Sequence, residues 1–351
     1  MNGAESLVHT LLEGGVDVCF TNPGTSEMHF VAALDKIEGM RCVLCLFEGV
    51  VSGAADGYAR MAGKPAATLL HLGPGLGNAL ANLHNAKKAR SPVVNVVGEH
   101  ATYHIQYNTP LTSDIEGVAR PVSGWVKASP DAASVGRLGA EAIAAAKTPP
   151  GQVATLILPA NTAWDDGGEV GTVPAVPARE TVDDKRVDEA AARLRGDERA
   201  LLLLGGPALF AEPMEMAGTI AVAADCDLMA EGMNSRVQRG AGRMALNRIP
   251  YPVPQALEVL KPYKHIVLVG ARPPAGFFAY PGMPSLLAPE GCEVFQLARA
   301  EQDCAAALQA LADRVGAKPG TAKVQPLDRP ERPTGPITLE SIAAAIGALL
   351  P

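Results

Sequence analysis

The stretch LFEGVVSGAADGYAR, residues 46–60, joins the end of an apolar strand to a helix. Glu48 lies at the junction, where the partial positive charge at the N-terminus of a helix stabilises a carboxylate. Small residues recur along the helix, at positions 49, 53, 54, 55 and 57, and leave one of its faces nearly bare. Either a neighbouring helix or a flat ligand must approach that face closely. Glu48 is therefore either a functional carboxylate or an N-terminal acid on a tightly packed interface helix.

Apolar strands alternate with helices on both sides of this stretch. The sequence predicts strands over residues 16–20, 41–47, 66–72, 93–98 and 152–159, and helices over residues 2–13, 26–36, 49–61 and 76–89. The strands lack a polar alternation, which is typical of a parallel sheet covered by helices on both faces. Residues 1–165 are therefore expected to form a doubly wound α/β domain.

Three of the predicted strands end in turn-forming residues. These ends are NPGT at residues 22–25, FEG at 47–49 and HLGPG at 71–75. In open parallel sheets, ligands bind beyond the carboxyl ends of the strands. The functional site is therefore expected where these three segments meet.

A second α/β unit follows a linker. Residues 166–184 are rich in Gly, Pro and acids without a period, as in a linker. Residues 185–318 predict a second mainly parallel sheet, with strands at 200–206, 227–231, 265–270 and 292–298 and helices at 185–195, 211–224, 253–260 and 302–315. Residues 319–336 form a Pro-rich linker, and a helix that Thr338 could cap follows within residues 337–351.

Composition restricts the partners and the compartment. The net charge of −7 argues against nucleic acid or an anionic membrane as a partner. The N-terminus lacks a basic region followed by an apolar core, and no apolar stretch reaches 18 residues, so a cytoplasmic protein is expected. Cys42 and Cys45 form a C-x-x-C pattern inside an expected buried strand, which favours two core thiols over a redox or metal site.

Three blocks of the sequence resemble one known family. The blocks NPGTSE, FEGVVSGAADGYAR and HLGPGLGNALANLHNAKKARSPVVNVVGE match, in order and spacing, the pyrimidine-binding domain of thiamine-diphosphate enzymes. The likeness is to the acetolactate synthase and benzoylformate decarboxylase branch. Residues 185–316 resemble the central domain of that family, and ITLESIAAAIGALL resembles the opening of its diphosphate-binding domain. The resemblance implies a three-domain architecture that lacks its third domain here.

The resemblance also implies an activity and a cofactor. The expected substrate is a small 2-oxo acid, which is decarboxylated, joined to a second carbonyl compound, or both. Glu48 matches the glutamate that hydrogen-bonds N1′ of the aminopyrimidine of thiamine diphosphate and so activates the cofactor. The Mg²⁺ ligands are expected in the missing third domain. A homodimer or homotetramer is expected, because active sites in this family lie between subunits.

Other site residues are carried over from the same blocks. Thr25 matches an active-site serine of benzoylformate decarboxylase and is expected to bind the substrate carboxylate, or else to cap the following helix. His71 matches a catalytic histidine of that enzyme, and an imidazole suits proton transfer near neutral pH. Gly24, Gly73 and Gly75 are expected to let the backbone approach the cofactor ring, and Asn78 to fix the loop.

The sequence departs from the family pattern at several positions. The second catalytic histidine of benzoylformate decarboxylase would fall near Phe277, where no histidine is present. Where many relatives have Gly-Gln, this chain has Gly98 followed by Glu99 and His100, which place an extra acid and base near the pocket or form a polar loop. The central unit carries no dinucleotide fingerprint around Gly205 and Gly206, so FAD is not expected.

Three hypotheses for the chain remain open at this point. It is a part of a longer enzyme, one subunit of a split enzyme, or a non-catalytic binding or regulatory relative on the same scaffold. No Gly-Asp-Gly segment of the diphosphate site occurs in the sequence. These 351 residues alone are therefore expected to be inactive and to bind the cofactor weakly.

Overall fold

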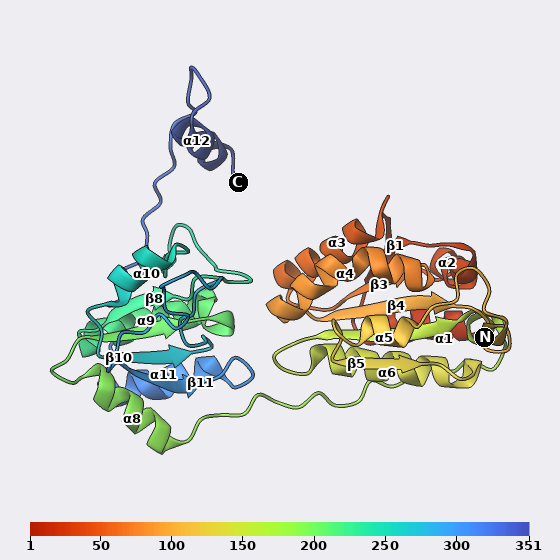
Figure 1. Cartoon of the computed structure of the whole chain (residues 1–351), viewed down its shortest axis with the longest axis horizontal. Helices are drawn as coiled ribbons and strands as arrows, with labels where there is room; N and C mark the ends of the chain where they lie inside the picture. Colours follow the sequence, from red (N-terminus) through yellow and green to blue (C-terminus); the bar gives the residue numbers. More distant parts are fainter. Residues whose placement is uncertain (351) are drawn as a thin grey trace. The chain divides into compact units, whose positions relative to one another are not determined.

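The computed structural model describes residues 1–350 and divides the chain into two compact units. The first unit comprises Met1–Arg179, and the second begins at Glu180. Both units are α/β, and each contains one parallel sheet (Figure 1). The predicted fold class of two parallel-sheet domains is confirmed.

The first unit contains a six-stranded parallel sheet in the order β2-β1-β3-β4-β6-β5. The strands are β1 (Val18–Asn22), β2 (Arg41–Leu44), β3 (Ala66–Leu70), β4 (Val93–Glu99), β5 (Trp125–Ala128) and β6 (Val153–Pro159). Apolar side chains of α1 (Gly3–Glu13), α2 (Met28–Lys36) and α6 (Ala132–Lys147) share one core with the sheet. Those of α3 (Glu48–Ala62), α4 (Leu72–Ala89) and α5 (Ile115–Ala119) share a second. The sheet is therefore covered on both faces, as a run of apolar strands requires.

The second unit contains a five-stranded parallel sheet in the order β11-β10-β7-β8-β9. Its strands are β7 (Ala200–Leu204), β8 (Asp227–Ala230), β9 (Asn247–Arg248), β10 (His265–Val269) and β11 (Glu293–Ala298). Its helices are α8 (Asp184–Leu194), α9 (Ala211–Ala224), α10 (Val253–Leu260) and α11 (Cys304–Val315). The last helix, α12 (Leu339–Leu349), is capped by the Thr338 side chain, as predicted.

The expectation of a buried strand at residues 41–47 is wrong. Strand β2 ends at Leu44 and lies at the edge of the sheet, so that most of its side chains are exposed. Cys45 is buried, but Cys42 is exposed, so only one of the two thiols belongs to the core. The apolar pattern misled because exposed apolar residues on an edge strand look like core residues in sequence.

Two further local predictions were incomplete. Helix α4 begins at Leu72 rather than at residue 76, so Gly73 and Gly75 lie in its first turn. The sequence pattern does not predict strand β5 or helix α6, although α6 is an Ala-rich helix of 16 residues. The sequence between residues 99 and 150 lacks the long apolar strand signal that marked the other elements.

Candidate active site at the edge of the first sheet

The three turn segments that follow β1, β2 and β3 are neighbours in space. These strands are adjacent and parallel, with Thr21 opposite Leu44 and Asn22 opposite Leu70. Their carboxyl ends therefore lie along the same edge of the sheet. This arrangement brings the segments at residues 22–25, 47–49 and 71–75 together, in agreement with the sequence prediction.

Glu48 is the first residue of α3, and its carboxylate is half-buried between α3 and α4. Asn78 donates a hydrogen bond from Nδ2 to Oε2 of Glu48 over 3.0 Å. Gly75 leaves room for both Glu48 and His71, since a Cβ at position 75 would lie 3.2 Å from Oε1 of Glu48 and 3.4 Å from Cβ of His71. Gly75 thus separates the carboxylate from the imidazole, and the two side chains flank one small residue.

His71 precedes α4 in a strained turn. The next residue, Leu72, has a φ of 51°, a left-handed conformation that non-glycine residues rarely adopt. The imidazole packs directly on Gly24, where a Cβ would lie 2.2 Å from Nδ1 of His71. Backbone contact therefore fixes one side of the ring, and only Gly fits at position 24.

Glu27 is a residue of this site that sequence reasoning missed. Its Oε2 lies 2.8 Å from Nδ1 of His71, and its side chain is almost fully buried. The sequence suggested only a helix start at this position. The available signal was its place at the end of NPGTSE, where a lone acid follows a turn at a strand end.

Thr25 and Gly73 occupy less central positions. Thr25 is exposed and is the first residue of a short 3-10 turn, Thr25–Glu27. The alternative role of Thr25 as a helix cap is wrong, because the cap position is Gly24 and the turn starts at Thr25 itself. A Cβ on Gly73 would lie 2.3 Å from Oγ of Ser113, so Gly73 admits the segment before α5.

A shallow apolar hollow of about 590 Å³ lies along α3 and α4 beside Glu48. Its walls come from Phe47, Gly49, Val50, Gly53, Ala54, Asn78, Ala81 and Asn82. This is the bare helix face recognised in the sequence. A flat aromatic ring that carries hydrogen-bonding nitrogens fits such a surface, since it would find an apolar wall with one carboxylate at its rim. The residues present therefore suit the aminopyrimidine end of thiamine diphosphate.

A second cavity of about 380 Å³ is lined by Glu99 and by Ser113. Glu99 ends β4 and is buried, and its burial raises the pKa of the carboxyl group, although the N–H of His100 donates a hydrogen bond to it over 2.7 Å. Nε2 of His100 lies 3.2 Å from Oγ1 of Thr109. Ser113 also packs on Gly73, so this cavity borders the turn that carries His71.

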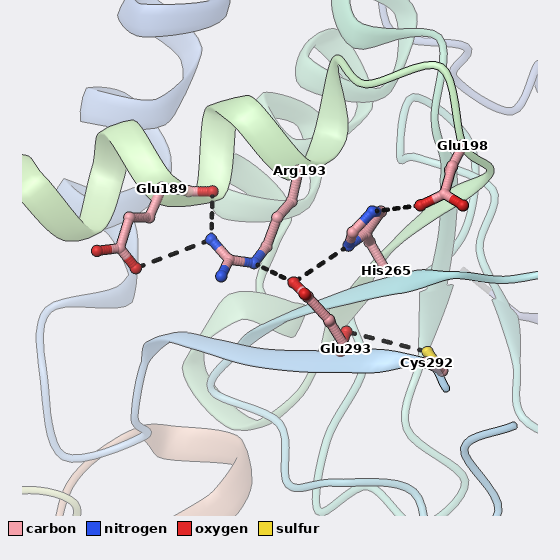
Figure 2. Close-up of polar contacts among 6 residues, drawn as sticks. All are labelled: Glu189, Arg193, Glu198, His265, Cys292 and Glu293. Atoms are coloured by element: carbon pink, nitrogen blue, oxygen red, sulfur yellow. Dashed lines mark hydrogen bonds and ion pairs between the residues drawn. The ribbon is translucent and has the colours of Figure 1, made fainter. Parts of the chain in front are cut away.

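A charged cluster in the second unit lies where strands β10 and β11 begin (Figure 2). Nε2 of His265 lies 3.1 Å from Glu198, and Nδ1 lies 3.6 Å from Glu293. Arg193 of α8 binds Glu293 over 3.2 Å and stacks on the ring of Phe295 at 4.4 Å. His265 and Glu293 are the first residues of β10 and β11, whereas ligands bind beyond the last residues of parallel strands. The cluster therefore links α8 to the sheet.

The remaining positions singled out in the sequence lie in the second unit. Phe277 is exposed in the segment after β10 and contacts the rings of Tyr251 and Phe278. Gly205 packs closely on the backbone of Ala271. Among residues 1–350, no group of three or more His, Cys, Asp or Glu side chains is arranged to hold a metal ion. No helix in this range is both long and apolar enough to cross a membrane.

Comparison with known proteins identifies the first unit. Residues 1–119 match the family model of the thiamine pyrophosphate enzymes, N-terminal TPP-binding domain. The protein IlvX of Mycobacterium tuberculosis, whose name assigns it to the acetolactate synthase large subunits, is 54% identical to this chain over 353 residues. The alignment covers 100% of this chain and 67% of IlvX. Benzoylformate decarboxylase of Pseudomonas aeruginosa is 32% identical over 199 residues, which cover 56% of this chain and 34% of the enzyme.

Solved structures support the same relationship at the level of the fold. The thiamine diphosphate-dependent 4-hydroxybenzoylformate decarboxylase of Rhodococcus jostii matches with a TM-score of 0.76 at 20% identity, over 95% of this chain and 66% of that chain. The present chain therefore spans about two thirds of the length of the M. tuberculosis protein and of the R. jostii enzyme. The chain belongs to the thiamine pyrophosphate enzyme family, in the group that contains acetolactate synthase and benzoylformate decarboxylase.

Proposed function

We propose that this chain forms the aminopyrimidine-binding part of an enzyme that uses thiamine diphosphate to decarboxylate a small 2-oxo acid, to join it to a second carbonyl compound, or both. One observation carries the proposal. A carboxylate, Glu48, opens a glycine-lined helix at the rim of an apolar hollow and is held there by Asn78. The strand ends around it are the edge at which parallel sheets bind ligands.

The cofactor would lie with its pyrimidine ring against the bare face of α3. Glu48 would share a proton with N1′ of that ring, and Asn78 would orient the carboxylate. Gly49 and Gly53 would let the ring lie close to the helix. Thiamine diphosphate supplies a carbon nucleophile and an electron sink for the electron pair released by decarboxylation. Its diphosphate and Mg²⁺ would be bound by a diphosphate-binding domain that is not part of these 351 residues.

The substrate would lie between the cofactor and the turns that carry Thr25 and His71. The Thr25 hydroxyl, which is exposed at the sheet edge, would donate a hydrogen bond to the carboxylate of the 2-oxo acid. His71 would move a proton to or from the oxygen of the former keto group. Glu99, whose pKa is raised by burial, would place a further acid in the cavity that borders the turn of His71.

A homo-oligomer would complete the site. Leu44, Leu46, Phe47 and Val50 form an exposed apolar patch, hereafter the β2–α3 patch, which continues into the hollow beside Glu48. Exposed apolar patches of this kind mark interaction surfaces. A second subunit on the β2–α3 patch would cover the hollow and exclude water from Glu48.

The test is carbon dioxide release by the native assembly, purified from the cells that make it and supplied with thiamine diphosphate and Mg²⁺. A panel of pyruvate, 2-oxobutyrate and benzoylformate covers small and aromatic 2-oxo acids. Release with at least one of them, lost in Glu48→Gln, is the expected result. A failure of the assembly to decarboxylate or consume any 2-oxo acid would contradict the proposal.

A further inference from the structure

Glu27 is a buried carboxylate whose two oxygens have very different surroundings. Its side chain is only 1% exposed, at the turn between β1 and α2. Oε2 accepts a hydrogen bond from the backbone N–H of Gly24 over 2.8 Å and lies 2.8 Å from Nδ1 of His71. Oε1 has no hydrogen-bond partner among residues 1–350. It packs on β4 at Gly98, where a Cβ would lie 1.7 Å from it.

These contacts determine the direction of the hydrogen bond to His71. The N–H of Gly24 can only donate, so Oε2 is an acceptor. An oxygen that already accepts from a backbone N–H, and whose neighbouring oxygen is unpartnered, binds best to a second donor. Nδ1 of His71 is therefore the nitrogen that carries the hydrogen, and a carboxylate that accepts from Nδ1–H leaves Nε2 free.

We propose that Glu27 is a positioning residue that holds His71 as the Nδ1–H tautomer, so that Nε2 is the nitrogen that accepts and returns the proton. The inference rests on the proposed function for the reaction that His71 serves. Nε2 takes one proton from the reacting group and later gives the same proton back, and Glu27 stabilises the doubly protonated ring in between. A buried acid that orients a histidine in this way is a recurrent device in proton-transfer sites.

Capping of the short turn does not account for this arrangement. A cap needs one bond from the carboxylate to a backbone N–H, and such acids normally keep their other oxygen in water. Glu27 instead buries an oxygen without a partner, which costs stability. The packing of Oε1 on Gly98 and of the His71 ring on Gly24 fixes both ends of the pair. A function of the Glu27–His71 pair accounts for this loss of stability.

Nitrogen NMR of the whole chain tests the tautomer without any cofactor or activity. The chain is labelled with ¹⁵N-histidine, and two-bond ¹H–¹⁵N spectra are recorded at about pH 8.5, where an imidazole is neutral. Among the seven histidines, the signal lost in His71→Asn is that of His71. The parent is expected to show protonated Nδ1 and bare Nε2. Glu27→Leu removes the acceptor, and its His71 is expected to shift toward the Nε2–H form.

A second variant and a control keep this test decisive. Gly98→Ala retains the carboxylate but pushes it off its position, so it should change the His71 signal in the same direction even if Glu27→Leu does not fold. Glu141→Gln, at a surface acid of α6 paired with Lys127 and Arg137, should leave the signal unchanged. An Nε2–H tautomer in the parent, or an unchanged Nδ1–H tautomer in Gly98→Ala, would overturn the proposal.

Kinetics of the native assembly then separate this proposal from the proposed function. Glu27→Gln keeps the shape but removes the charge, so kcat for the 2-oxo acid should fall by about 10²- to 10⁴-fold, the usual range for lost acid–base catalysis, while KM changes little. An equal kcat in Glu27→Gln and the parent would overturn the role of Glu27. If no 2-oxo acid is consumed even by the parent, the proposed function fails, whereas the tautomer measurement still decides how Glu27 holds His71.

Discussion

At the scale of single residues, glycines decide which polar groups can meet at the sheet edge. Gly24 lets the backbone touch the ring of His71, Gly75 separates His71 from Glu48, and Gly98 leaves room for the carboxylate of Glu27. In each case a Cβ would lie within 3.4 Å of a polar residue of the site. The side chains of the candidate site are thus packed on backbone, which restricts their motion before any ligand arrives.

Glu99 gives a prediction for the dependence of stability on pH. Burial raises the pKa of Glu99 above its ordinary value of 4.5. The folded state therefore holds this proton more tightly than the unfolded state, so the free energy of unfolding falls as the pH rises from about 4.5 through the raised pKa. Glu99→Gln removes this cost. The variant should melt at the same temperature as the parent at pH 4 and at a higher temperature at pH 7.5.

Thermal unfolding at several pH values, followed by circular dichroism, checks this prediction. Glu141→Gln is a matched control, because the ion pairs with Lys127 and Arg137 lower the pKa of Glu141. That variant should lose a little stability at neutral pH. A Glu99→Gln variant that is destabilised at pH 7.5 would show that the ionised carboxylate is stabilised by its surroundings.

At the scale of elements, most of the first sheet could be predicted from sequence. Continuous apolar runs at β3, β4 and β6 and the turn residues after β1 and β3 carry enough information to place the site. The edge position of β2 could not be predicted, because it depends on which strand lies beside it. The pairing of Glu27 with His71 could not be predicted either, since these residues are 44 positions apart and meet only through the order of β1, β3 and β4.

Two glycines of helix α3 differ in the space around them, and alanine substitutions test the effect of this difference on stability. Gly57 lies in the interior of α3 and is exposed, and a Cβ added at this position would have no atom within 4 Å. Gly57→Ala should therefore raise the free energy of unfolding by about 0.5–1 kcal/mol through the higher helix propensity of Ala. Urea unfolding of the chain measures the change. Gly53→Ala is the comparison, because its Cβ would meet Asn82 at 3.0 Å, and it should stabilise the chain less.

At the scale of the whole molecule, the β2–α3 patch is the surface through which we propose that the chain self-associates. Leu46 is 94% exposed and precedes Phe47 and Val50, which are also exposed. If the patch is the subunit interface, Leu46→Asp places a charge in it and should convert the oligomer into monomer at micromolar concentration. Sedimentation velocity measures this shift. Leu327→Asp, at an exposed leucine between α11 and α12, should leave the oligomer intact, and a monomeric parent would contradict the interface.

The most direct test of the role of Glu48 is hydrogen–deuterium exchange at C2 of thiamine diphosphate bound to the native assembly with Mg²⁺. Glu48→Gln keeps the size of the side chain but removes the group that shares a proton with N1′. The exchange rate in the variant should fall by about 10²- to 10⁴-fold, while the folded structure is preserved. Glu141→Gln should exchange as the parent does. Exchange in Glu48→Gln as fast as in the parent would contradict the account and leave Glu48 as an acid that only begins helix α3.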